Sequence, residues 1–144
     1  MRRIIACFAV VLILSVAGLS ACKNGSADVT YKNGVYVGKS GEDDRGAYGE
    51  VTITIESGAV ADCVFVTWQK DGSIKDEDYG KVNGEISNQD YYDKAQLAVA
   101  AMADYARQFV AAQELADVDA IAGATIAFGQ FEEAVIDALD EAKE

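Results

Sequence analysis

The residues best suited to chemistry form a short run near the C-terminus, from Asp119 to Thr125, which contains the turn Gly123-Ala124-Thr125. The run lies between two stretches of helical pattern, so Thr125 falls at or near a helix start. Such a turn offers small side chains, free backbone N–H groups and one hydroxyl, a combination that can seat a phosphate. The simpler interpretation is that the Thr125 hydroxyl caps the first turn of the second helix.

Composition excludes several other kinds of chemistry. The chain contains no histidine, which excludes Ser-His-Asp and Cys-His catalysis and removes the commonest metal ligand. Cys7 and Cys22 lie in or beside an export signal. Cys63 lies in an apolar run, where a single thiol is usually a small core residue. The acids of the polar stretch 69–88 lack the spacing of an EF-hand calcium loop, so we expect no metal site.

The N-terminal residues have the features of a bacterial lipoprotein signal. Two arginines at positions 2 and 3 precede an apolar run that is too short, and wrongly flanked, for a membrane span. The tetrapeptide Leu-Ser-Ala-Cys at positions 19–22 matches the lipobox, in which the cysteine is acylated and becomes the first residue after cleavage. We therefore predict a lipoprotein signal peptide over residues 1–21 and lipid attachment at Cys22. An ordinary secretory signal with a coincidental cysteine is the alternative.

The net charge indicates which partners the mature chain can bind and how it attaches to a membrane. The full chain has a net charge of −12, and loss of two arginines with the signal peptide makes it more negative. An acidic surface argues against nucleic acid and against polybasic contact with anionic lipid. Attachment to the membrane would then rest on the Cys22 lipid, with residues 22–32 as a polar linker. We expect the protein at the cell membrane, on its extracytoplasmic face.

The first half of the remaining domain, residues 33–144, is predicted to form a sheet. Strands are expected over 34–39, 48–56 and 60–68. A turn at Ser57-Gly58 is short enough to make the last two strands antiparallel. The long polar stretch over 69–88 follows, and loops of that length inside a compact domain tend to be functional or mobile.

The second half is predicted to be helical. One helix is expected from about Asp90 to Gln113, with an apolar, core-facing stripe that includes Leu97 and Tyr105, and Ser87 or Asn88 as its cap. A second is expected from 126 or 128 to 143, with its acidic residues between 132 and 141 on the wet, solvent-facing side. The fold class is therefore α+β, an antiparallel β-sheet with two C-terminal helices packed on it.

Several short segments together resemble one known family, the FMN-binding domain family. Its flavin-attachment motif has Asp, two variable residues, Ser or Thr, Gly, Ala and Thr or Ser, in that order. The resemblance covers nearly the whole mature chain and rests on these segments: Gly34 to Gly38, Gly46-Ala47-Tyr48-Gly49, Ser57-Gly58, Gly123-Ala124-Thr125, and Phe131 to Val135. On this resemblance, residues 33–144 form one FMN-binding domain of the covalently flavinylated, lipoprotein type.

The resemblance implies roles for the C-terminal run. A flavin transferase (FAD:protein FMN transferase) would take FMN from FAD and join its phosphate to the Thr125 hydroxyl. Asp119 would be the acid recognised during transfer, or one that lies near a metal of the transferase reaction. Gly123 and Ala124 would let the backbone approach the phosphate. Ala122 stands where the family has Ser or Thr, which leaves non-covalent FMN binding open as an alternative.

The flavin ring needs a flat apolar neighbour, because aromatic faces stabilise flat ring systems by stacking. Tyr48, Trp68 and Tyr79 are candidates, and Gly49 accompanies Tyr48 in the family-like turn. Tyr79 is the first choice, since it lies in the polar stretch beside a glycine. The candidate basic residues for contact with the phosphate are Lys39, Lys81 and Arg45.

Two classes of function follow from these observations. The first is a membrane-anchored electron carrier that receives electrons from a membrane donor through FMN; the cofactor then does the redox chemistry, which favours an electron-transfer flavoprotein over a stand-alone enzyme. The second is a non-redox surface lipoprotein that binds a ligand or a protein partner, with the Gly-Ala-Thr turn serving only as a helix cap.

Overall fold

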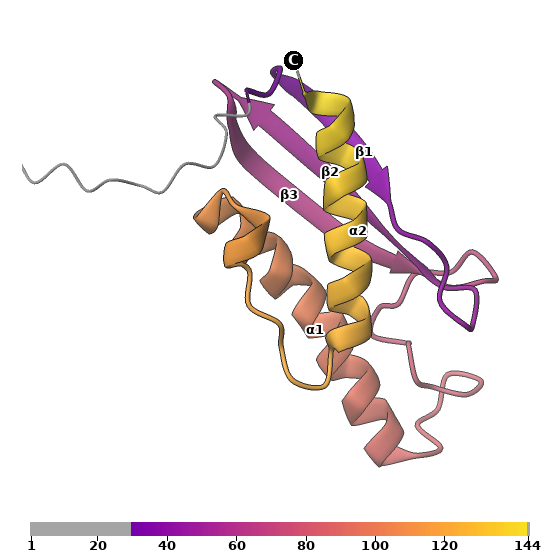
Figure 1. Cartoon of the computed structure of the whole chain (residues 1–144). Coiled ribbons are helices and arrows are strands. Elements are labelled where there is room, and N and C mark those ends of the chain that lie inside the picture. The colour runs from indigo at the N-terminus through magenta and orange to yellow at the C-terminus, as the bar shows by residue number, and fades with distance from the viewer. Residues whose placement is uncertain (1–29, 144) are drawn as a thin grey trace, which may run out of the picture.

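The computed structural model describes residues 30–143 (Figure 1). The predicted signal peptide, Cys22 and most of the linker lie outside the described residues. The elements, in chain order, are β1 (Gly34–Lys39), β2 (Tyr48–Glu56), β3 (Ala59–Trp68), α1 (Gln89–Ala112), the short 3-10 helix η1 (Leu115–Asp117) and α2 (Thr125–Ala142). The strands match the predicted ranges, except that β3 begins one residue earlier than expected.

The three strands form one antiparallel sheet in the order β1-β2-β3. Ser57 and Gly58 connect β2 to β3, and both have positive φ, 54° and 76°. A two-residue turn of that kind matches the right-handed twist of the strands it joins. Val51 and Ile53 of β2 point toward the helices and are fully buried, as their alternation with threonines predicts.

Both helices cover the same face of the sheet, so the α+β prediction is confirmed. α2 packs against β1 and β2, while α1 packs against β3 (Figure 1). The largest fully buried side chains of the helices are Tyr105, Phe109 and Phe131. Their rings meet one another, with 5.8 Å between the centroids of Tyr105 and Phe131 and 6.1 Å between those of Phe109 and Phe131. These aromatic contacts join the two helices above the sheet.

Cys63 of β3 belongs to the same core and is 8% exposed. Burial, and to a smaller extent the charge of Asp62, raises the pKa of its thiol to about 12. The thiol is therefore protonated and unreactive at physiological pH. Its predicted role as a small core residue is confirmed.

The ends of α1 are fixed by side chains. Asn88 is the cap of the helix, and its side-chain oxygen accepts a hydrogen bond from the Tyr91 N–H at 3.0 Å. At the other end, the Gln113 amide bonds both backbone groups of Val60, at 2.8 and 2.9 Å. Leu97 was expected in the core stripe but is 43% exposed, because the first half of α1 extends beyond the sheet (Figure 1).

The two ends of α2 lie at opposite ends of the domain. The Lys32 N–H donates to the carbonyl of Ala142 at 2.9 Å, so the start of the described chain lies beside the end of α2. Thr125 lies at the other end of this 18-residue helix, about 27 Å away at 1.5 Å per residue. The Gly-Ala-Thr turn is thus far from the point where the linker enters the domain.

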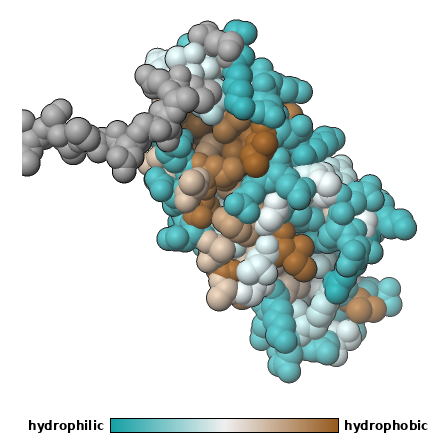
Figure 2. Space-filling model, in the orientation of Figure 1, coloured by the Kyte–Doolittle hydropathy of each residue, from teal (hydrophilic) through white to brown (hydrophobic). Residues whose placement is uncertain are grey.

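Hydrophilic side chains cover the rim of the helical face, and hydrophobic ones gather toward its middle (Figure 2). The predicted wet side of α2 is largely confirmed, since Glu133, Asp137, Asp140 and Glu141 are exposed. Within residues 30–143, no helix is both long enough and apolar enough to cross a membrane.

Candidate functional site

A cavity of about 420 Å³ opens where the start of α2, the end of β3 and the middle of α1 meet. The predicted residues Gly123, Ala124 and Thr125 line one wall, and Tyr79 from the long polar loop lines another. Four of the residues named from the sequence as cofactor ligands therefore come together around one space. Ala98 and Met102 of α1 add apolar surface to the same space.

The first turn of α2 presents its backbone to this cavity. The helix begins at Thr125, and its cap position is Ala124, which has no side chain to bond the first turn. The first helical hydrogen bond runs from the Phe128 N–H to the Ala124 carbonyl at 3.0 Å. The N–H groups of the three preceding residues have no helical partner, and they carry the positive end of the helix dipole. The interpretation of the Thr125 hydroxyl as the cap of this helix is therefore wrong.

Gly123 is required by the shape of this turn. Its φ is +87°, a conformation that favours glycine. A Cβ at this position would also lie 2.8 Å from Cδ2 of Leu97. Leu97, on the part of α1 beyond the sheet, thus packs against the turn. The exposed Thr125 hydroxyl follows two residues later, at the edge of the cavity.

Two side chains of α1 hold the run from Asp119 to Ala124 in place. The hydroxyl of Tyr105 accepts a hydrogen bond from the Ile121 N–H at 3.0 Å and donates to the Ala124 carbonyl at 3.2 Å. The Gln108 side chain accepts from the Asp119 N–H at 2.9 Å. Tyr105 is fully buried, so its hydroxyl is a fixed support for the turn. The sequence identified Tyr105 only as a core residue, because nothing in it links a helix position to a turn so far along the chain.

We expect Tyr105→Phe to loosen this turn. The change removes both hydrogen bonds, so the Ile121 N–H and the Ala124 carbonyl each lose a partner. We expect this to lower the free energy of unfolding by about 1–3 kcal/mol. The Ile121 amide should exchange with solvent faster in native-state hydrogen exchange. The matched control is Tyr92→Phe, which removes a hydroxyl that donates to the Glu77 carbonyl in the polar loop. Unchanged exchange at Ile121 in Tyr105→Phe would contradict this account of the turn.

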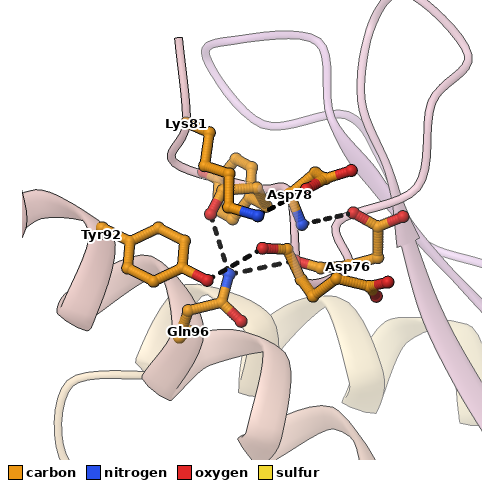
Figure 3. Close-up of polar contacts among 7 residues, drawn as sticks. Asp76, Asp78, Lys81, Tyr92 and Gln96 are labelled. Atoms are coloured by element: carbon orange, nitrogen blue, oxygen red, sulfur yellow. Dashed lines mark hydrogen bonds and ion pairs between the residues drawn. The ribbon is translucent and has the colours of Figure 1, made fainter. Parts of the chain in front are cut away.

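Tyr79 is positioned by side chains of α1 that pin the polar loop. Gln96 Nε2 donates to the carbonyls of Asp76 and Tyr79, at 3.1 and 2.9 Å (Figure 3). The Tyr92 hydroxyl donates to the Glu77 carbonyl at 3.0 Å. The long stretch that the sequence predicted as a loop is thus a loop, and α1 holds it through its backbone carbonyls.

Lys81 adds a charged contact within the same loop. Its Nζ lies 2.7 Å from Oδ1 of Asp78 and 5.8 Å from the centre of the Tyr92 ring (Figure 3). The hydrogen bond that Lys81 donates to Asp78 raises the pKa of Lys81, against a smaller opposing effect of burial. Lys81 therefore interacts with its own loop and with Tyr92, and it does not line the cavity.

Three cations line the cavity: Arg45, Lys70 and Lys75. Among residues 30–143, none of the three forms an ion pair, while Lys39 pairs with Glu50 at 3.1 Å. Of the three basic residues suggested from the sequence, only Arg45 lies at the cavity. Lys70 and Lys75 were missed, since their charge gives no sign of which element they approach.

Two carboxylates, Asp43 and Asp71, also line the cavity, but each accepts hydrogen bonds from residues of its own loop. Asp43 Oδ1 accepts from the N–H groups of Arg45 and Ala47, at 2.9 Å each. Burial raises the pKa of Asp43, but these two hydrogen bonds and the charges of Lys75 and Arg45 together outweigh it, and the net pKa is lowered. Asp71 Oδ1 accepts from the Ser73 hydroxyl and N–H, which lowers its pKa. Both acids are therefore ionised at neutral pH.

The other predicted aromatic residues lie away from the cavity. Tyr48 and Trp68 are partners in the β2–β3 register and share the sheet face opposite the helices. Lys39 Nζ lies 5.5 Å from the centre of the Tyr48 ring. Neither residue lines the cavity, so of the three candidate ring neighbours the fold brings only Tyr79 to the turn.

Gly49 and Asp119 also lie outside the cavity lining. A Cβ at Gly49 would come within 2.8 Å of the Phe65 ring and 3.0 Å of Gln130 Cβ. Glycine is needed there for the close approach of α2 to the sheet. Asp119 is exposed, and its backbone N–H and carbonyl both form hydrogen bonds with the Gln108 side chain.

Comparison with known proteins identifies the family of this chain. The model of the FMN-binding domain family matches residues 34–140. The crystal structure of the CPE2226 protein from Clostridium perfringens is similar in fold, with a TM-score of 0.62 and 19% sequence identity over 78% of this chain and 88% of that chain. None of the curated proteins matches the sequence. The family match spans most of the chain and includes the turn at the cavity, and we conclude that the chain belongs to the FMN-binding domain family.

Proposed function

We propose that this protein is a lipid-anchored flavoprotein that carries electrons outside the cytoplasm, with FMN in the 420 Å³ cavity and its phosphate joined to Thr125 Oγ1. The observation that carries the proposal is the exposed Thr125 hydroxyl on the cavity edge, beside backbone N–H groups that have no helical partner. An attached phosphate at this position meets the positive end of α2.

The residues around the cavity fit FMN. The start of α2 suits a phosphate, and Gly123 allows the backbone to approach it. Tyr79, Ala98 and Met102 offer aromatic and apolar surface for a flat ring. The cavity volume lies within the usual range for cofactor sites, about 300–1,000 Å³. In an acidic protein, the three cations of the cavity outnumber its two carboxylates and supply the local positive charge that an anionic nucleotide needs.

Attachment requires a partner enzyme, a flavin transferase. The Thr125 oxygen would form the new phosphoester bond, the pyrophosphate bond of FAD would break, AMP would leave, and the hydroxyl proton would pass to a base of the transferase. The exposure of Thr125 supports this role, because a large enzyme must reach the hydroxyl. Bound FMN supplies reversible electron transfer, and the protein holds it and tunes it.

The position of the cavity supports transfer of electrons between the flavin and partner proteins. The linker to Cys22 would enter beside the end of α2, and the cavity lies at the start of that helix. The flavin would thus lie about 27 Å from the linker side of the domain. We propose that a membrane electron donor reduces the flavin and that an acceptor meets it at this far end.

Purified protein made together with a flavin transferase tests the proposal. We expect a yellow protein whose visible flavin absorbance is lost on anaerobic addition of dithionite and returns in air. A colourless protein that also fails to take up added FMN would contradict the proposal. That outcome would favour the alternative, a non-redox surface lipoprotein.

A further inference from the structure

Lys75 is the most enclosed of the three cations in the cavity. It is half-buried, whereas Arg45 and Lys70 are exposed. Its backbone N–H donates to the Thr67 carbonyl at 2.9 Å, which fixes it against the edge of β3. Its Nζ lies 5.2 Å from the centre of the Tyr79 ring. The backbone and the ammonium group of Lys75 are therefore both positioned by neighbours that line the same cavity.

The charge of Lys75 is not neutralised by an adjacent carboxylate. Within residues 30–143 it forms no ion pair. Burial lowers its pKa, the more distant Asp43 partly offsets this effect, and Arg45 adds to it. The carboxylate of Asp43 is bonded to its own turn and that of Asp71 to Ser73. Lys75 thus holds a positive charge in a partly dry space, where charges interact more strongly than in water.

We propose that Lys75 sets the electron affinity of the bound flavin, as the residue that favours reduced over oxidised FMN. The proposal rests on FMN occupying the cavity. Two-electron reduction of FMN at neutral pH takes up two electrons and one proton, so the ring gains one negative charge. Lys75 Nζ lies 5.2 Å from the centre of the Tyr79 ring, so a flavin ring stacked on Tyr79 would lie within about one Debye length of this charge, ~8 Å at physiological salt. A nearby positive charge stabilises a negatively charged group, so it favours the reduced, anionic ring over the neutral oxidised ring.

The other two cations are less suited to this role. Arg45 and Lys70 are exposed, so solvent screens them more. The aliphatic part of Lys70 packs against Gly46, with its Cδ 3.1 Å from where a Cβ of that glycine would lie. These two residues better suit the phosphate or the rim of the cavity, and Lys75 suits the ring that stacks near Tyr79.

The test is the midpoint potential of the flavin in Lys75→Gln, measured by anaerobic equilibrium titration against a redox dye, with dithionite as the reductant. We expect the preference for reduced over oxidised FMN to fall about tenfold, which for a two-electron couple lowers the potential by about 30 mV. Lys75→Met, which also lacks the charge but keeps a long side chain, should give the same shift. Lys75→Arg keeps the charge and should restore most of the potential.

The matched control is Lys94→Gln, which removes one positive charge from an exposed position on α1 outside the cavity. Its potential should equal that of the unmodified chain. An unchanged potential in both Lys75→Gln and Lys75→Met would overturn the role of Lys75 while leaving the FMN site intact, and so would an equal shift in Lys94→Gln. An unmodified protein that takes up no FMN would overturn the FMN site, and the role of Lys75 with it.

Discussion

Replacing Thr125 by alanine is expected to abolish covalent flavin and leave the domain folded. The hydroxyl is the only atom group lost that can form the phosphoester bond. It lies at the first residue of α2, exposed, and does not cap the helix. The free energy of unfolding should therefore change by no more than about 0.5 kcal/mol. Intact mass under denaturing conditions measures the attachment, and urea unfolding of flavin-free protein measures the stability.

Thr125→Ser is the matched control for this experiment. It keeps a hydroxyl at the same backbone position and should still receive flavin from the transferase. Covalent flavin retained in Thr125→Ala would mean that another residue is the attachment site. Loss of flavin in both variants, with both folded, would show that the transferase needs the threonine methyl group as well.

The largest effect on stability is expected from Gly38→Ala. A Cβ at Gly38 would lie 2.1 Å from the Ala134 carbonyl oxygen and 2.4 Å from the Ala138 nitrogen. Both atoms belong to the backbone of α2, which cannot move aside without leaving β1. We expect the free energy of unfolding to fall by about 3 kcal/mol or more. Chemical denaturation followed by far-ultraviolet circular dichroism measures this loss.

Gly129→Ala is the same substitution at another glycine, and we expect it to raise stability where Gly38→Ala lowers it. Gly129 lies inside α2, and nothing lies within 4 Å of a Cβ built there. Alanine favours the helix, so this variant should be more stable by about 0.5–1 kcal/mol. Equal stability of Gly38→Ala and the unmodified chain would contradict the close packing of α2 on β1. Since α2 carries Thr125, that result would also undermine the placement of the turn.

Much of the fold could be predicted from the sequence because its signals are local. Val51 and Ile53 alternate with threonines, and this period of two residues fixes both the strand and its buried face. Ser57-Gly58 fixes the hairpin, and Asn88 starts α1. Leu97 was misassigned to the core because the helical period shows a face but not where the sheet beneath it ends.

The candidate site was predictable only where its residues are neighbours in sequence. The motif from Gly123 to Thr125 is continuous, so it was found directly. Tyr105 of α1 bonds the backbone of this turn, and Lys75 reaches the cavity from the polar loop. Both contacts depend on how distant segments pack. The capping role suggested for Thr125 is wrong because α2 begins at Thr125 itself, one to three residues earlier than its apolar pattern indicates.

The central claim is that Thr125 carries FMN, and intact mass of the mature domain tests it most directly. The domain should be produced with a flavin transferase, purified, denatured and weighed by mass spectrometry. We predict a single species heavier than the polypeptide by one FMN less one water, with the added mass on the peptide that contains Thr125. An unmodified mass, from a protein that is folded and also binds no free FMN, would contradict the claim.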